Sequence, residues 1–154
     1  MLGDFGKHIF FMQKAYEQAL LAYDAGEVPI GAVVVDQNNE ILAQSYNQTI
    51  TLNDPTAHAE ILAIREATKL LNNYRLVNTK LYVTLEPCIM CFGALVQARV
   101  TKLIYACDDT RVGVTSIQKL HQCKNFNHNF EIINGVMNQQ CGELLRKFFK
   151  ERRK

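Results

Sequence analysis

No part of this sequence is an uncharged apolar run long enough to cross a membrane. Residues 1–20 contain charges at Asp4, Lys7, Lys14 and Glu17, and they lack the apolar core of a secretory signal. These two absences argue against a membrane protein and against a secreted one. We therefore expect a cytoplasmic protein that has no membrane partner.

The sequence also has no internal repeat, no linker-like segment and no low-complexity stretch. Its 154 residues, 48% of them hydrophobic, are enough for one domain with a substantial core. We expect a single domain over residues 1–154, in which about 8–145 form the core and 146–154 form a basic helix end.

Cysteine is scarce, and its five positions form an odd set that does not favour a disulfide framework. A reducing compartment fits this usage better. Only Cys88 and Cys91 have the spacing of metal ligands, so Cys107, Cys123 and Cys141 are predicted to be buried or uninvolved thiols.

A formal net charge of +2 is too small to indicate nucleic-acid binding by itself. The distribution of the charge is more informative, because residues 146–154 carry six basic side chains against the single acid Glu151. The basic residues are Arg146, Lys147, Lys150, Arg152, Arg153 and Lys154. A basic helix end of this kind is typical of a nucleic-acid contact.

Two short segments carry the residues suited to chemistry: His58-Ala59-Glu60 and Pro87-Cys88-Ile89-Met90-Cys91. Each is predicted to form the first turn of a helix, and the cap-type run Asp54-Pro55-Thr56 precedes the first of them. Cys88 and Cys91 lie three apart on one helical face, so their thiols can share an ion.

One histidine and two thiolates leave the fourth position of tetrahedral zinc open for water, which is the catalytic pattern rather than the structural one. The positive ends of two helices would help to keep Cys88 and Cys91 deprotonated. Zinc lowers the pKa of such a water toward ~7, and a neighbouring Glu60 could accept and pass on its proton. The pattern therefore predicts hydrolytic deamination, with His58 as the third ligand.

The remaining pattern predicts alternating strands and helices. The expected strands are 30–36, 41–45, 80–85, 102–106 and 130–133. The expected helices are a first one with apolar positions from Met12 to Tyr23 that ends at Gly26, one that begins near His58, 88–99, a short turn at 117–120, and a last helix capped by Asn138. A strand-helix-strand unit with short joints implies a right-handed parallel crossover, which brings the helix starts to one edge of the sheet.

The H-x-E and P-C-x-x-C segments form the signature of zinc deaminases. Together with their surroundings they make this chain resemble the family of bacterial tRNA-specific adenosine deaminases, within the cytidine and deoxycytidylate deaminase superfamily. The matching runs are 27–33, 54–61, 73–76 and 81–88. The resemblance implies an α/β fold, a three-layer α/β/α sandwich of cytidine deaminase type with a mixed five-stranded sheet and helices on both faces.

The same resemblance implies an activity and its partners. The expected reaction is the conversion of adenosine to inosine at the wobble position of a tRNA anticodon, with arginine tRNA as the expected substrate. The expected cofactor is one Zn²⁺ per subunit, held by His58, Cys88 and Cys91, with Glu60 as the catalytic residue. The expected partners are the tRNA anticodon loop and a second copy of the chain that helps to build each pocket; no DNA partner is expected.

Substrate contacts also follow from the resemblance. Asn47 would hydrogen-bond the purine ring, although an asparagine that merely ends a strand is also common. Val28 and Pro29 would form the pocket wall, and a strand start would explain them as well. The backbone N–H of Ala59 would lie near the reacting carbon.

Two further contacts concern the RNA. Asp109 matches an acidic residue in a family loop near the substrate strand, but the loop over 108–116 departs from the family pattern at Arg111 and at Val114-Thr115. Phe149 is the candidate for base stacking on the last helix, where its neighbour Phe148 could instead be core.

Other interpretations remain open at this point. A buried histidine beside a redox C-x-x-C pair is one, and a structural zinc site with a fourth ligand from His121, Cys123 or His128 is another. The chemistry could also act on a free base or nucleotide of guanine or cytosine type; Asn73-Tyr74-Arg75-Leu76 and the basic helix end argue against this. A zinc-bearing RNA-binding subunit without activity would have no need of Glu60.

Overall fold

The computed structural model describes residues 3–153 and contains a mixed five-stranded sheet in the order β2-β1-β3-β4-β5. The strands are β1 (Gly31–Val35), β2 (Ile41–Tyr46), β3 (Lys80–Leu85), β4 (Lys102–Cys107) and β5 (Glu131–Ile133). β1 is antiparallel to β2 and to β3, whereas β3, β4 and β5 run parallel to one another.

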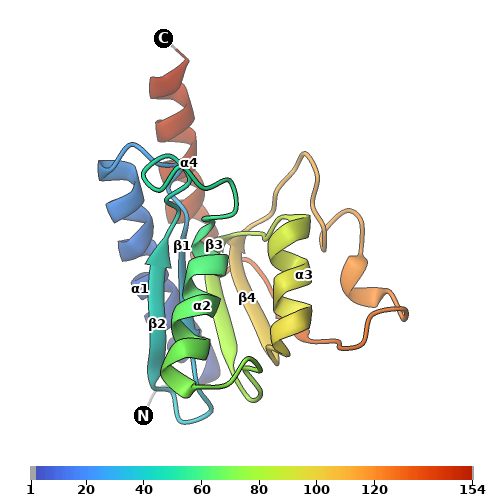
Figure 1. Cartoon of the computed structure of the whole chain (residues 1–154). Coiled ribbons are helices and arrows are strands. Elements are labelled where there is room, and N and C mark those ends of the chain that lie inside the picture. Colours follow the sequence, from blue (N-terminus) through green and yellow to red (C-terminus); the bar gives the residue numbers. More distant parts are fainter. Residues whose placement is uncertain (1–2, 154) are drawn as a thin grey trace.

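Four α-helices cover this sheet, and they lie on both of its faces (Figure 1). They are α1 (Asp4–Asp24), α2 (Ala59–Leu71), α3 (Ile89–Ala98) and α4 (Asn138–Arg152); a short 3-10 helix, η1 (Leu120–Gln122), follows β4. Helices α2 and α3 pack on one face and α1 and α4 on the other, which confirms the predicted three-layer arrangement. In the part of the chain that the structure describes, no helix is both long enough and apolar enough to span a bilayer.

Each face of the sheet has its own hydrophobic core, and β1 contributes to both. Ala32 and Val34 pack toward α2 and α3, whereas Val33 and Val35 pack toward α1. Since successive side chains of a strand point to opposite faces, a strand covered on both sides must be apolar at every position. All five residues of β1 are accordingly buried.

Helix α1 approaches the sheet very closely at Gly31, the first residue of β1. A Cβ atom at this position would lie 2.0 Å from the backbone oxygen of Ala15 and 2.7 Å from the backbone nitrogen of Ala19. Helix and strand therefore meet backbone to backbone at a position that only glycine can occupy.

The topology gathers several loops at one edge of the sheet, which we call the C-terminal edge because β3 and β4 both end there. The start of β1 and the end of β2 lie at the same edge, since β1 is antiparallel to both β3 and β2. Residues 27–30, 47–58, 86–88 and 108–116 therefore converge there (Figure 1). In open α/β sheets ligands favour this edge.

Helix α1 begins at Asp4, before the apolar pattern that starts at Met12, and the chain leaves the helix at Gly26, as predicted. Two local predictions were wrong. The helical turn expected at 117–120 lies at Leu120–Gln122, as η1. Asn138 is the first residue of α4, whereas the cap is Met137 in a left-handed conformation with φ of 61°.

The run Asp54-Pro55-Thr56 does not cap α2. The cap is His58, and the Asp54 carboxylate instead accepts hydrogen bonds from the backbone N–H and the hydroxyl of Thr56, at 2.9 and 2.7 Å. This turn redirects the chain just before the helix starts.

Candidate metal centre and active site

The predicted metal ligands lie at the starts of two neighbouring helices. His58 is the cap residue of α2 and Cys88 is the cap residue of α3, both in extended conformation, and Cys91 lies in the first turn of α3. Cap and first-turn side chains point past the helix end, where backbone N–H groups remain free. Cys88 lies at this edge because only Glu86 and Pro87 separate it from the end of β3.

The three side chains converge at one point. The Nδ1 atom of His58 lies 3.5 Å from the Sγ of Cys88 and 3.4 Å from the Sγ of Cys91. All three potential ligand atoms lie within 4.8 Å of one another, and this is the one such group in residues 3–153. Zinc bonds of about 2.0 Å to nitrogen and 2.3 Å to sulfur, at a tetrahedral angle, would separate the two ligand atoms by about 3.5 Å. The observed spacing fits a metal ion.

The electrostatics of the thiols also fit a cation. A hydrogen bond from the Cys91 thiol, together with His58, lowers the pKa of Cys88 to about 4. The Cys88 thiolate and burial raise the pKa of Cys91, and Cys88 also raises the pKa of His58. Two thiolates this close repel each other, and a divalent cation between them would offset that repulsion.

Glu60 lies in the first turn of α2, beside this cluster, and only 4% of it is exposed. Burial raises the pKa of its carboxyl group to about 7, with the negative charge of Cys88 as a further cause. A carboxyl group whose pKa lies near neutrality can both accept and return a proton at working pH.

The predicted contacts of the base lie on segments at the same edge. Asn47 is 5% exposed, and its N–H donates to the oxygen of Ile30 at 3.1 Å, so the end of β2 is held against the start of β1. The next residue, Gln48, donates to the oxygen of Ala57 at 2.9 Å. Asn47 is thereby brought close to the segment that leads into α2.

Three other predicted substrate contacts, the two pocket-wall residues and Ala59, differ in exposure. Val28 is half-buried and Pro29 is buried, just before β1. Ala59 is fully buried and is the first residue of α2, so its N–H has no acceptor within the helix.

The side chain of Asp109 shapes its own loop. Its Oδ1 accepts hydrogen bonds from the backbone N–H groups of Arg111 and Val112, at 3.0 and 3.4 Å. The Asp109 backbone N–H donates to the carboxylate of Glu86 at 2.8 Å. One carboxylate oxygen of Asp109 is therefore already engaged within the loop.

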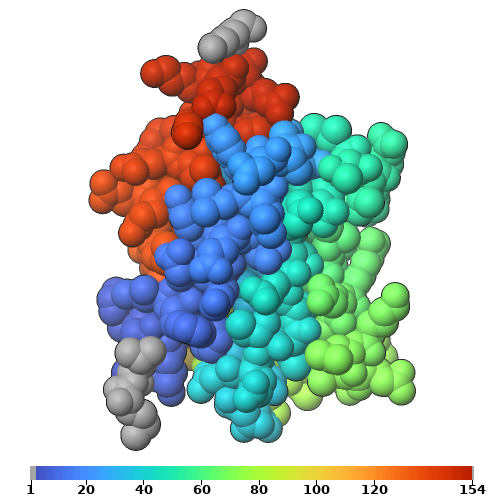
Figure 2. Space-filling view, turned by 90° about the vertical axis from the view of Figure 1, so that its left-hand side faces the viewer, coloured from blue at the N-terminus to red at the C-terminus, as the bar shows by residue number. Residues whose placement is uncertain are grey.

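The structure distinguishes the two phenylalanines of α4. Phe148 is buried and packs edge-on against Tyr23 of α1, whereas Phe149 is 43% exposed. Beyond them, the Tyr23 hydroxyl donates to the Glu151 carboxylate at 2.5 and 2.6 Å, and Arg152 donates to the oxygen of Gly26 at 2.7 Å. These contacts fix the end of α4 against the end of α1, as the adjoining surfaces in Figure 2 show.

The candidates for a fourth protein ligand lie elsewhere. The Nε2 atom of His128 is 2.7 Å from the oxygen of Val100, and neither His121 nor Cys123 belongs to the metal-type group found in the described chain. A structural four-ligand zinc site therefore has no support in residues 3–153.

Sequence reasoning missed two buried acids at this edge, Glu27 and Glu86, which are 0% and 3% exposed. Glu86 stands between an apolar strand and Pro87, and nothing in the local sequence marks it as buried.

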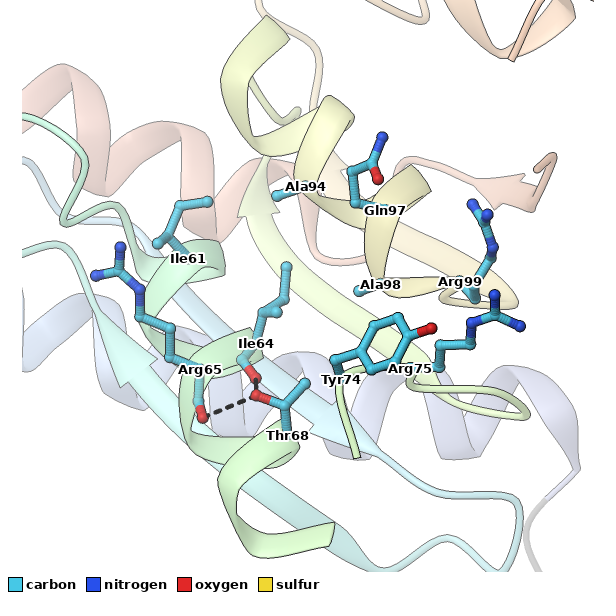
Figure 3. Close-up of a pocket in the computed structure, with 10 residues that line it drawn as sticks. All are labelled: Ile61, Ile64, Arg65, Thr68, Tyr74, Arg75, Ala94, Gln97, Ala98 and Arg99. Carbon is cyan, nitrogen blue, oxygen red and sulfur yellow. Dashed lines mark hydrogen bonds between the residues drawn. The ribbon is translucent and has the colours of Figure 1, made fainter. Parts of the chain in front are cut away.

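A separate groove lies between α2 and α3 and contains none of the metal-ligand candidates. Figure 3 shows Ile61, Ile64 and Arg65 of α2 facing Ala94, Gln97 and Ala98 of α3, with Tyr74 and Arg75 at one end. Tyr74 is 74% exposed, and the Arg75 guanidinium lies 5.4 Å from the centre of its ring. The groove begins at Ile61, one residue beyond Glu60.

Comparison with known proteins gives consistent matches. The model of the MafB19-like deaminase family matches residues 7–153. A tRNA-specific adenosine deaminase of Haemophilus influenzae is 42% identical over 144 residues, which cover 92% of this chain and 83% of that protein.

Two solved structures are also similar. One, from work on A-to-I editing by tRNA deaminases at the wobble position of transfer RNA, has a TM-score of 0.85 and 39% identity over 88% of this chain and 99% of that one. This match confirms the predicted fold class. A guanine deaminase of Bacillus subtilis is 43% identical, but it matches only 63% of this chain and 62% of its own, with a TM-score of 0.60.

Proposed function

Since this chain belongs to the family of tRNA-specific adenosine deaminases, we propose that it hydrolyses adenosine to inosine at the wobble position of a tRNA anticodon. One observation in the structure carries this conclusion: the buried carboxyl group of Glu60 lies beside a His-Cys-Cys group that suits a metal. A redox pair or a passive RNA-binding scaffold needs no such carboxyl group. The enzyme would act in the cytoplasm, with arginine tRNA as its main substrate.

We propose zinc as the metal, held by His58, Cys88 and Cys91, because one imidazole and two thiolates suit it and neutralise its charge. When bound, zinc supplies an acidified water for hydrolysis of the C6 amino group. Glu60 would accept a proton from the water whose oxygen adds to C6 and deliver it to N1 of the adenine, and a further proton would go to the amino group as its bond to C6 breaks. The products are inosine and ammonia, so the atoms of adenosine and water are conserved.

The base would be held by groups at the C-terminal edge. We assign Asn47 to the purine ring, Val28 and Pro29 to the pocket wall, and the free N–H of Ala59 to the neighbourhood of C6. Asp109 would contact the RNA through the carboxylate oxygen that its loop leaves available. A base in a loop can be flipped out for a few kcal/mol, which is less than a paired base would cost.

We expect Phe149→Ala to weaken binding of an anticodon stem-loop by about tenfold, because stacking of one base on an aromatic ring is worth about 1–3 kcal/mol. The variant should fold normally, since Phe149 is exposed. Fluorescence anisotropy at several salt concentrations would measure the affinity and its salt dependence.

Phe148→Ala is the matched comparison, and it should lower stability instead, because Phe148 is buried against Tyr23. This pair of variants is more informative than removal of the chain beyond Arg146, which would also delete the anchors Glu151 and Arg152. Unchanged affinity in Phe149→Ala would mean that this aromatic ring does not contact the RNA.

We further propose a homodimer that forms through the groove between α2 and α3. The groove begins at Ile61, the residue after Glu60, so a second copy seated there would lie near the start of α2 and would cover the apolar side chains of the groove. We expect Tyr74→Asp to weaken the dimer at least about tenfold, because it places a charge at a surface that pairing would desolvate. Sedimentation velocity across a concentration series would measure this.

The control for the dimer is Val77→Asp, which puts the same charge on a 55% exposed side chain outside the groove. It should leave the mass at two chains. A wild-type protein that sediments as one chain at all concentrations would contradict the homodimer.

The function itself is tested by three substrates assayed side by side. The purified protein should form inosine from an anticodon stem-loop with adenosine at the wobble position, and it should release little ammonia from guanine or cytidine. A chelator should stop the reaction, and added zinc should restore it. Turnover of guanine alone would favour the free-base alternative, and tight stem-loop binding without inosine would favour an inactive RNA-binding subunit.

A further inference from the structure

Glu86 holds together the loop that follows β4. Its carboxylate accepts five hydrogen bonds of 2.7–2.8 Å: from the N–H of Asp109, and from both the N–H and the hydroxyl of Thr115 and of Ser116. The donors lie 23 to 30 residues away in the sequence, and they belong to both ends of the loop over 108–116. This carboxylate therefore closes the loop and attaches it to the segment that carries Cys88.

Glu27 does the same for the loop that follows β2. Its Oε1 accepts the N–H of Ile50 at 3.1 Å, and its Oε2 accepts the N–H and the hydroxyl of Thr51 at 2.6 and 2.7 Å. The side chain is fully buried, and it immediately precedes the predicted pocket wall at Val28 and Pro29. Glu27 thus ties this wall to the loop that begins at Asn47.

The two anchored loops flank the metal-type cluster from different strands. The loop of Glu27 leads from Asn47 to His58, and the loop of Glu86 begins beside Asp109. Both lie at the C-terminal edge of the sheet, where the ends of β2 and β4 meet the starts of α2 and α3 (Figure 1). Because α2 also starts at this edge, we take these loops to border a substrate that reaches Glu60.

We propose that Glu27 and Glu86 are positioning residues, whose buried carboxylates set the two loops in the arrangement that receives the RNA substrate. They act through the loops and do not touch the reacting atoms. The inference rests on the proposed function, because it takes the bordering loops to contact the anticodon strand.

Chemistry explains why a carboxylate is needed. All five donors to Glu86 are neutral N–H or O–H groups, so both of its oxygens must accept. A glutamine has the same shape but offers one accepting oxygen and one NH₂ group, which would face donors and leave at least one N–H unpaired. When a buried N–H loses its hydrogen bond to a charged group and finds no other acceptor, the free-energy cost is larger than when water can replace the acceptor.

The test measures loop order and kinetics together in Glu86→Gln and Glu27→Gln. In Glu86→Gln we expect amide hydrogen exchange at Thr115 and Ser116 to become at least about tenfold faster. In Glu27→Gln we expect the same increase at Ile50 and Thr51. The KM for the anticodon stem-loop should rise about tenfold while kcat changes less than about threefold. The metal content should stay at one per chain.

Glu131→Gln is the matched control, because it makes the same chemical change at the start of β5, at the other end of the parallel strands. It should leave exchange and KM unaltered. If Glu86→Gln fails to fold, Ser116→Ala removes only one of the five hydrogen bonds and should raise KM in the same direction by a smaller factor.

Unchanged exchange in the variants would show that the carboxylates do not hold the loops, and unchanged KM despite faster exchange would show that loop order does not serve the RNA. Either result overturns the proposal. A wild-type protein that forms no inosine would instead refute the proposed function, so the two failures are distinguishable.

Discussion

Replacement of Glu60 by glutamine is expected to lower kcat for inosine formation by about 10²–10⁴, the range that one general acid-base group contributes. The amide keeps the shape of the side chain but cannot carry the proton from water to N1 or to the leaving amino group. Single-turnover assays on the anticodon stem-loop would measure the loss directly, free of product release.

The fold and the metal content should survive this change. Burial raises the pKa of Glu60 to about 7, which means that the site disfavours the charged form, and glutamine carries no charge. Glu66→Gln is the matched control, because it alters an exposed residue of the same helix. Glu60→Ala should behave like Glu60→Gln, and a purified variant of either kind that remained active would remove this residue from the mechanism.

Cys88→Ser should abolish both metal binding and activity. The substitution replaces a thiolate, the ligand with the strongly lowered pKa, by an alcohol that stays protonated, and it leaves one negative charge to balance a divalent ion. Loss of metal affinity should exceed about 100-fold, since even changes in the partners that orient metal ligands cost 10–100-fold. Metal analysis after dialysis against a chelator would measure the content.

The control for Cys88→Ser is Cys123→Ser, a half-buried thiol that lies outside the metal-type group. It should retain one metal per chain and full activity. A Cys88→Ser protein that still bound zinc stoichiometrically would mean that the cluster is not the metal site, and it would favour the redox interpretation of the two cysteines.

The central strands and the metal-ligand segments could be predicted because their local sequence pattern favours the same structure that they adopt in the folded protein. The strand over 80–85 has the bounds of β3, since alternation and β-branched or aromatic residues mark a strand in any context. The cluster of His58, Cys88 and Cys91 could be expected to converge because parallel crossovers bring helix starts to one edge. For these three residues, their places at the starts of two helices were enough to predict that their side chains meet.

Other features depend on contacts that the local sequence does not contain. The first turns of α1 carry exposed Phe5 and Phe10, which break the amphipathic pattern and hid the start of the helix. Met137, just before α4, has a left-handed backbone conformation, which glycine and asparagine adopt most readily.

The loop anchors could not be found from spacing for a similar reason. The donors to Glu86 lie up to 30 residues away, and a glutamate before a proline has no local mark of burial. Only the folded loop reveals why this acid is present. The same holds for Tyr23 and Glu151, which are 128 residues apart in the sequence and share a hydrogen bond.

The backbone contact between α1 and Gly31 also affects where α4 lies. Because the α1 backbone meets β1 directly at Gly31, any larger residue at this position would push α1 away from the sheet. Tyr23 near the end of α1 and Gly26 just after it hold Glu151 and Arg152 of α4, so a shift of α1 would be passed on to α4. The position of α4, and with it that of the exposed Phe149 ring, therefore depends on the residue at position 31.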